Sequence, residues 1–171
     1  MQPFPMTIAP ETGAATPEAD AFVDALFEKL DTDRQKLVTQ AAIASQSRER
    51  VARAARAWWD EFSQVLERKV AAWNAKDAPD ARVTFTRNPS GSMTLWHRSV
   101  EAELSLADTR VVMTGRIGPT RPRESPFIEF SEARGDVGAI LAGEGTTKSP
   151  NDAADHLLGP ILSHAFAGFA A

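Results

Sequence analysis

The stretch MTLWHRSVEAEL, Met93 to Leu104, decides how the middle of the chain must fold. In an extended strand, alternate side chains share one face. Met93 and Leu95 lie on one face, whereas the apolar residues that follow Ser99 lie on the other. A single strand with one buried face cannot contain such a change of phase. The sequence therefore predicts a turn or a β-bulge over Trp96–Ser99.

On both sides of this stretch, short runs of strand-like residues alternate with turn residues. Short connections between successive strands favour an antiparallel meander of five or six strands. Besides the two halves of the opening stretch, the expected strands are RVTFTRN (82–88), RVVMTGRIG (110–118), PFIEFSEA (126–133) and DVGAILAG (136–143).

Helical spacing is found before the strands. Thr16-Pro17-Glu18 has the cap, the proline and the acid that are typical of a helix start. Apolar residues then recur at helical spacing, and we expect a break at SQSR, Ser45–Arg48. From Val51 to Trp73, apolar residues fill one sector of a long amphipathic helix, which ends before Pro79.

A final helix is expected at the C-terminal end. It starts at Ser149, with Pro150 at the first helical position and Asp152 at the third, close to a capping box. Gly159-Pro160 is expected to kink or interrupt it.

These elements predict an α+β fold: an N-terminal helical hairpin with a long amphipathic helix, an antiparallel meander of five or six strands, and a C-terminal helix. Residues 1–15 are expected to form a flexible arm, and residues 16–171 a single domain. If FPMTIA (4–9) forms a first strand, the order of elements becomes that of a helix-grip fold, by analogy alone.

Composition restricts the chemistry and the location of the chain. It has no cysteine, which excludes disulfides and thiolate nucleophiles and suits a reducing compartment. No apolar run is long enough to span a membrane, and the N-terminus does not have the pattern of a signal peptide, so the expected location is cytoplasmic.

Charge is distributed unevenly along the helical part of the sequence. Residues 1–33 carry seven acids and one base, whereas residues 34–76 carry nine bases and four acids. Two helical segments of opposite charge can lie against each other or be solvated independently.

Trp96, His97 and Arg98 form the first candidate site. A tryptophan can stack on a ligand, a histidine can move a proton, and an arginine can hold an anion. The triplet also falls at the change of phase, where a strand-end bend with a half-buried tryptophan explains it. We favour the bend.

Asp152, Asp155 and His156 form a polar cluster that resembles a metal or acid–base site. However, Asp152 is already explained as a capping acid, and Asp152 with His156 is an ordinary pair across one helical turn. Neither a metal, a cofactor nor a catalytic residue is predicted.

A run of arginines suggests a nucleic-acid surface: Arg48, Arg50, Arg53 and Arg56. The sequence pI of about 5.4 makes nucleic acid the less favoured partner.

Trp58, Trp59 and Trp73 lie on the apolar sector of the long helix. Aromatic residues at helical spacing usually belong to a core, and a subunit interface and a cavity wall are the alternatives. The helix Val51–Trp73 is about 35 Å long, so part of its aromatic face is available to a partner.

The sequence therefore favours a non-enzymatic interaction or scaffold module, a homodimer through its aromatic helical face. The alternative is a protein that binds a small hydrophobic ligand between a curved sheet and the helices. The third and least favoured function is a hydrolase that uses Asp152, Asp155 and His156.

Overall fold

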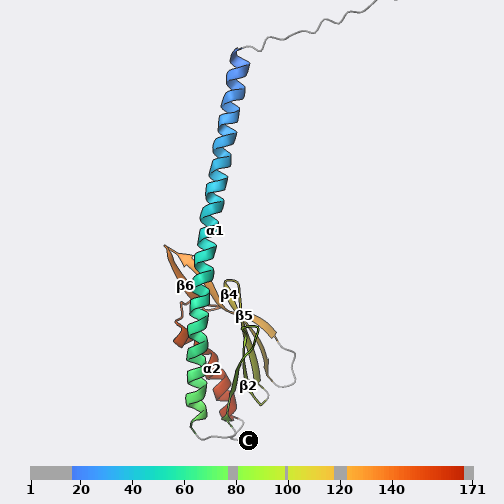
Figure 1. Cartoon of the computed structure of the whole chain (residues 1–171). Helices are drawn as coiled ribbons and strands as arrows, with labels where there is room; N and C mark the ends of the chain where they lie inside the picture. Colours follow the sequence, from blue (N-terminus) through green and yellow to red (C-terminus); the bar gives the residue numbers. More distant parts are fainter. Residues whose placement is uncertain (1–16, 77–80, 99, 118–122, 168–171) are drawn as a thin grey trace, which may run out of the picture. The chain divides into compact units, whose positions relative to one another are not determined.

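The computed structural model describes residues 17–76, 81–98, 100–117 and 123–167. It contains one six-stranded antiparallel sheet in the strand order β1-β2-β3-β4-β5-β6, so the predicted meander and the α+β class are confirmed (Figure 1). The elements in chain order are α1 (Pro17–Asn74), β1 (Thr84–Arg87), β2 (Met93–His97), β3 (Val100–Ala107), β4 (Arg110–Ile117), β5 (Arg123–Ala133), β6 (Asp136–Leu141) and α2 (Pro150–Ala167).

The N-terminal helical part differs from the sequence prediction. α1 is one continuous helix, so the expected break at Ser45–Arg48 and the helical hairpin are wrong. Nothing between Pro17 and Asn74 is a glycine or a second proline, and polar residues alone do not end a helix. From Pro17 onward, the acidic and basic segments therefore follow each other along one helix.

The chain divides into two compact units, Met1–Ser45 and Gln46–Ala171, which we call the N-terminal and C-terminal units. Whether residues 16–171 behave as a single domain stays a prediction. The arm expected over residues 1–15 and the possible strand FPMTIA lie outside the described residues.

The change of phase in the opening stretch is a hairpin turn. His97 pairs with Val100 across β2 and β3, so only two residues connect the strands. Arg98 has a positive φ of 48°, a conformation that tight hairpin turns require. The hairpin pairs Met93 with Leu104 and Leu95 with Ala102. The apolar side chains on both sides of the turn therefore lie on one face of the sheet.

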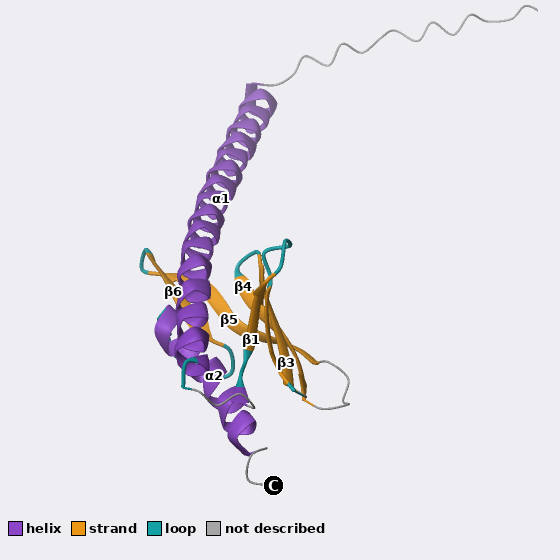
Figure 2. Cartoon of the chain, turned by 60° about the horizontal axis from the view of Figure 1, so that its bottom comes forward, coloured by secondary structure: helices purple, strands orange, loops and turns teal. Residues whose placement is uncertain are grey.

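That apolar face packs against the two helices to form the core of the C-terminal unit. Figures 1 and 2 show the C-terminal part of α1 and α2 side by side on this face of the sheet. Phe62, Leu66, Leu104 and Ile128 are completely buried, and burial of such side chains is the main source of stability in a domain of this size. The core also includes Val51, Ala55, Val65, Val70, Met93, Leu95, Val111, Phe130, Leu141, Leu157, Leu158 and Ile161.

A register shift between Val111 and Val112 interrupts the pairing of β4 with β5. A strand that passes such an irregularity can direct two consecutive side chains inward. Phe127 and Ile128 are accordingly both buried, although they are neighbours on β5. This irregularity brings a phenylalanine into the core, where its ring centroid lies 6.2 Å from that of Phe62.

Side-chain hydrogen bonds fix the end of α1 to the beginning of the sheet. The Asn74 amide donates to the Val83 carbonyl oxygen at 2.8 Å and accepts from the Val83 N–H at 3.0 Å. The Trp73 indole N–H donates to the Ala81 carbonyl oxygen at 2.7 Å. These bonds pair backbone groups just before β1 and so determine where the chain enters the sheet.

α2 begins as the sequence predicts. The Ser149 hydroxyl accepts from the Asp152 N–H at 3.1 Å and donates to the Asp152 carboxylate at 2.7 Å, which caps the helix. Of the kink or interruption expected at Gly159-Pro160, the interruption is absent, because α2 continues through Pro160 to Ala167. The Lys69 ammonium of α1 lies 2.6 Å from the Asp155 carboxylate of α2 and links the two helices.

Candidate functional site

α1 carries apolar residues at alternating steps of three and four, the heptad spacing of coiled coils. The pattern runs from Val23 to Val65, and only Arg34 and Arg48 interrupt it. We call its N-terminal stretch the exposed seam, which consists of Val23, Phe27, Leu30, Arg34, Leu37, Ala41 and Ala44.

The two ends of this pattern have different environments. From Val51 onward its residues belong to the core of the C-terminal unit. In the N-terminal unit, by contrast, 67% of Phe27, 56% of Leu30 and 66% of Leu37 is exposed. Leu26, which lies beside the exposed seam, is 46% exposed. An exposed apolar surface of this extent is characteristic of a protein interface.

The side-chain hydrogen bonds and ion pairs that the structure gives for the N-terminal unit are local. Thr32, Gln35, Lys36 and Thr39 each contact a residue three or four positions earlier in the helix. The two side-chain pairs add a few tenths of a kcal/mol each, and a threonine hydroxyl bonded to the carbonyl oxygen four residues earlier adds no stability. Most helical stability in proteins comes instead from packing of the apolar face. The exposed seam has no such packing among the described residues of this chain.

Charge is distributed unevenly around the exposed seam. The segment 20–33, which we call the acidic half, contains Lys29 as its one base beside Asp20, Asp24, Glu28, Asp31 and Asp33. The segment 34–50, the basic half, contains Glu49 as its one acid beside Arg34, Lys36, Arg48 and Arg50. The acidic half is therefore followed directly by the basic half on the same helix.

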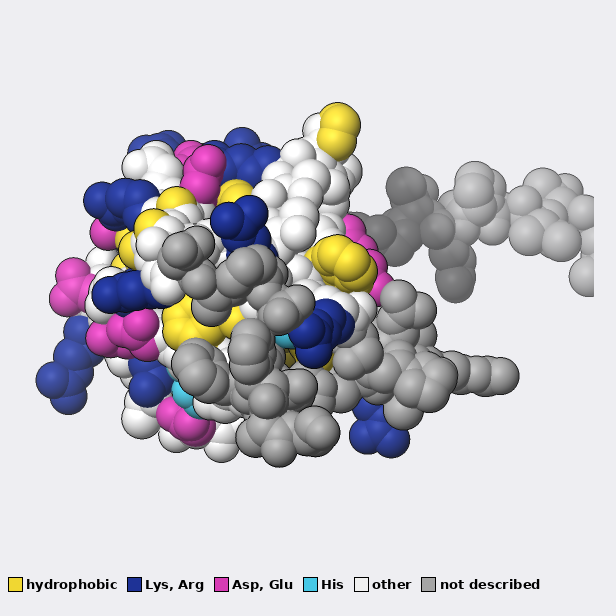
Figure 3. Space-filling view, turned by 90° about the horizontal axis from the view of Figure 1, so that it is seen from below, with side chains coloured by type: hydrophobic (Ala, Val, Ile, Leu, Met, Phe, Trp, Pro, Cys, Tyr) yellow, Lys and Arg dark blue, Asp and Glu magenta, His cyan; other side chains and the backbone are white. Residues whose placement is uncertain are grey.

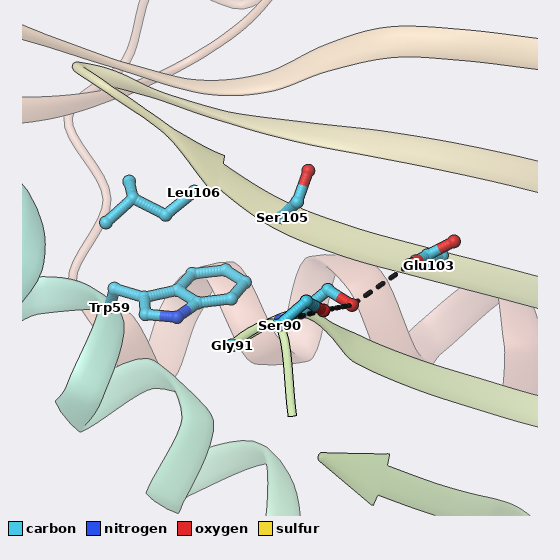
Figure 4. Close-up of a pocket in the computed structure, with 7 residues that line it drawn as sticks. Trp59, Ser90, Gly91, Glu103, Ser105 and Leu106 are labelled. Carbon is cyan, nitrogen blue, oxygen red and sulfur yellow. Dashed lines mark hydrogen bonds between the residues drawn. The ribbon is translucent and has the colours of Figure 1, made fainter. Parts of the chain in front are cut away.

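A pocket of about 340 Å³ lies between α1 and one end of the sheet (Figure 4). Trp59 and Leu106 provide its apolar wall, and the polar lining comes from Ser90, Ser92, Glu103 and Ser105. The Ser92 hydroxyl donates to the Glu103 carboxylate at 2.9 Å, which holds the carboxylate beside the pocket. The volume is at the lower end of the range for small-molecule sites.

The three tryptophans of the predicted helical face point into the C-terminal unit. Trp59 is 8% exposed, and Trp58 and Trp73 are partly buried against the core. Trp58 stacks on Phe62 with 4.8 Å between ring centroids and lies edge-on to Phe130 at 5.5 Å. Of the three, Trp59 also lines the pocket.

The structure separates the members of the Trp96-His97-Arg98 triplet. Trp96 is half exposed on the outer face of the sheet, and Arg98 is exposed in the hairpin turn. His97 is buried on the opposite face, where its Nδ1 lies 2.8 Å from the Arg82 carbonyl oxygen. The three side chains therefore do not converge on one ligand, in agreement with the interpretation as a bend.

The residues Asp152, Asp155 and His156 are engaged in the helix cap and in contacts with other elements. Asp152 is bound to Ser149, whose hydroxyl lowers the pKa of the Asp152 carboxyl below its ordinary value. Asp155 binds Lys69, and the His156 ring lies against Phe127 with 6.4 Å between centroids. The His156 Nδ1 is 3.9 Å from the Glu144 carboxylate. These contacts give all three residues a structural role.

Metal and nucleic-acid sites find no support among the described residues. These residues contain no group of three or more histidines and acids placed to hold a metal ion. The Arg50 guanidinium lies 2.9 Å from the Glu132 carboxylate, which partly neutralises the run of arginines. On the face shown in Figure 3, basic and acidic side chains are intermixed, whereas a nucleic-acid-binding surface carries a continuous basic patch.

None of the described helices combines the length and the apolar character needed to cross a bilayer.

Comparisons with known proteins give no match: no family model, no curated protein and no solved structure is similar to this chain.

The exposed seam was not identified from the sequence as the candidate interface. Its residues do carry a signal, because the heptad spacing continues without a glycine or proline from Val23 to Val65. The heptad spacing alone does not show which of these residues pack in the core of the chain and which stay exposed.

Proposed function

We propose that this protein is a non-enzymatic interaction module that self-associates through the exposed seam of α1. The observation that carries the proposal is the exposure of Phe27, Leu30 and Leu37 at heptad positions. The aromatic face that the sequence suggested as the interface already packs on its own sheet, so the proposed interface lies further toward the N-terminus.

A second copy of the chain is the proposed occupant. The exposed seam extends over three heptads, the length at which heptad spacing becomes a coiled-coil signal. An identical helix offers the same spacing and length, and its acidic and basic halves can complement those of the first copy.

Light scattering coupled to size exclusion tests this proposal on the full chain. We expect a dimer mass for the unmodified protein and a monomer mass for the double variant Phe27→Glu/Leu30→Glu. Burial of a phenylalanine or leucine contributes about 1.5–3 kcal/mol, so the loss of both weakens association by at least about 100-fold. A variant that elutes as the same dimer would refute the proposal.

Ile43→Glu is the matched control. Ile43 is 60% exposed but lies outside the heptad positions, so the same substitution there is expected to leave the dimer intact. The four tryptophans all lie in the C-terminal unit, so their fluorescence reports whether that unit stays folded in each variant.

The pocket beside Trp59 supports a second candidate function, the binding of a small molecule. Trp59 and Leu106 suit an apolar ring, and Glu103 with the neighbouring serines suits hydrogen-bond donors on that molecule. Compounds that bind only the native state raise its melting temperature. A fragment set of hydroxylated aromatic compounds should therefore raise the Tm of the unmodified chain but not that of Ser105→Trp, which fills the pocket. Equal shifts in both proteins, or none, would count against this function.

The hydrolase alternative is the least supported, because Asp152 belongs to the cap of α2 and Asp155 and His156 contact other elements. The cytoplasmic location and the exclusion of a nucleic-acid partner stay predictions from composition.

A further inference from the structure

We infer that two copies of α1 pair antiparallel along the exposed seam, in a register that places Leu30 of one copy opposite Ala41 of the second. The inference rests on the proposed self-association and assigns its orientation. Three properties of this part of α1 support it: the order of its charges, the position of Arg48 and the sizes of its apolar residues.

The order of charges favours the antiparallel orientation. Two parallel helices in register would place the acidic halves side by side and the basic halves side by side. Two antiparallel helices place each acidic half along the basic half of the second copy, which is complementary. The macrodipoles of the two helices also attract each other in this orientation and repel in the other.

Arg48, the heptad arginine that follows the exposed seam, favours the same orientation. A parallel pair in register would set Arg48 against Arg48 inside the contact, whereas Arg34 lies within one helical turn of its copy in either orientation. In the antiparallel register, Arg48 lies opposite Val23 of the second copy, within one helical turn of its Asp20 and Asp24. An arginine stem can pack on an aliphatic side chain while its guanidinium reaches carboxylates at the edge.

The sizes of the apolar side chains complement each other. In the antiparallel register, Phe27 lies opposite Ala44 of the second copy, and Leu30 lies opposite Ala41. A large residue facing a small one keeps the distance between two helices even along the contact. The parallel pair would place two phenylalanines together at one end and two alanines together at the other.

The extent of the contact matches the part of α1 that is left uncovered. Val51 is 7% exposed, because the heptad pattern from this residue onward belongs to the core of its own chain. In the antiparallel register, Asp20 of the second copy lies opposite Val51. Pairing over residues 20–51 therefore covers the whole exposed seam of both copies and ends where the core begins.

Disulfide trapping tests the orientation, since the chain has no cysteine of its own. Full-length Leu30→Cys and Ala41→Cys chains, one of them carrying a mass tag, are mixed in equal amounts and oxidised gently. A disulfide requires Cα atoms about 4.4–6.8 Å apart. In the antiparallel register the two copies of residue 30 are eleven residues apart along the axis, or about 16 Å, which is too far. Intact mass then separates mixed from like-with-like disulfides.

We expect mixed disulfides between residues 30 and 41 to exceed the half that random pairing gives. Predominant 30–30 and 41–41 disulfides would overturn the antiparallel inference and leave the proposed self-association standing. Dimers by light scattering that form no disulfide at all would show that the exposed seam is not the contact, and would overturn the inference. Monomers by light scattering before oxidation, for the unmodified chain and both variants, would overturn the proposed function together with the inference.

Discussion

Phe27 and Phe62 occupy equivalent heptad positions on the same helix, five heptads apart, yet 67% of Phe27 is exposed and Phe62 is completely buried. The local sequence pattern of α1 is thus the same at both places, and the difference lies in what covers it. Phe62 packs on Trp58, Trp59 and Phe127 of its own chain. The proposed self-association supplies a corresponding cover for Phe27.

Hydrogen exchange along α1 should show this difference directly. If a second copy covers the exposed seam, amides of residues 23–44 should exchange slowly at high protein concentration and faster on dilution, because dissociation leaves this segment without packing. Amides of residues 55–70 provide an internal control, since their protection comes from the core of one chain. Exchange followed by mass spectrometry measures both segments at once. Protection of 23–44 that does not change with concentration would argue against self-association.

Truncation of the buried phenylalanine should destabilise the C-terminal unit strongly. Phe62→Ala leaves a cavity among the rings of the core, and we expect a loss of about 3–5 kcal/mol in the free energy of unfolding. Phe22→Ala, at a position 69% exposed, should change the unfolding of this unit by less than about 0.5 kcal/mol. Urea denaturation followed by tryptophan fluorescence measures both. Similar losses in the two variants would contradict the described core.

The bonds between Asn74 and Val83 should stabilise the connection from α1 to the sheet. Asn74→Ala leaves both the N–H and the C=O of Val83 without this partner, with an expected cost of about 1–3 kcal/mol. Asn74→Asp keeps an acceptor for the Val83 N–H but sets a carboxylate oxygen against the Val83 carbonyl oxygen, so it should also destabilise the unit. The same urea titration ranks the three proteins, and an Asp variant as stable as the unmodified chain would refute the assignment.

The cap of α2 gives a prediction about pH. The hydrogen bond from the Ser149 hydroxyl is the main reason that the pKa of Asp152 lies below its ordinary value of 3.8, helped by Lys148 and Lys69. A lowered pKa in the folded state means that charged Asp152 stabilises the fold fully above that ordinary value. This contribution is lost as the pH falls through the lowered pKa.

Carbon NMR of the Asp152 carboxyl group across the acid range measures this pKa. We expect a midpoint below the ordinary value in the unmodified chain and a return toward it in Ser149→Ala. An unchanged midpoint in Ser149→Ala would show that the serine is not the cause.

Much of the fold follows from local patterns in the sequence. The change of phase before Val100 predicts a turn or a bulge, which is the hairpin at Arg98, and Ser149 with Asp152 predicts the start of α2. Both are local effects of strand alternation and helix capping. The paired burial of Phe127 and Ile128 could not be predicted, because it depends on a register shift against another strand.

The candidate interface was predicted less well, for a physical reason. Periodicity shows that one face of α1 is apolar, but it does not show which other element covers that face. The polar stretch Ser45–Arg48 suggests a break, although nothing in it prevents a helix. The sequence therefore favours Trp58, Trp59 and Trp73 as the interface, but these residues pack in or against the core, whereas Phe27 and Leu30 are exposed.

Sedimentation equilibrium of the unmodified full chain, over a wide range of concentrations, tests the central claim most directly. The account predicts a single self-association from monomer to dimer, and its loss in Phe27→Glu/Leu30→Glu but not in Ile43→Glu. A chain that sediments as a monomer at every concentration would contradict it.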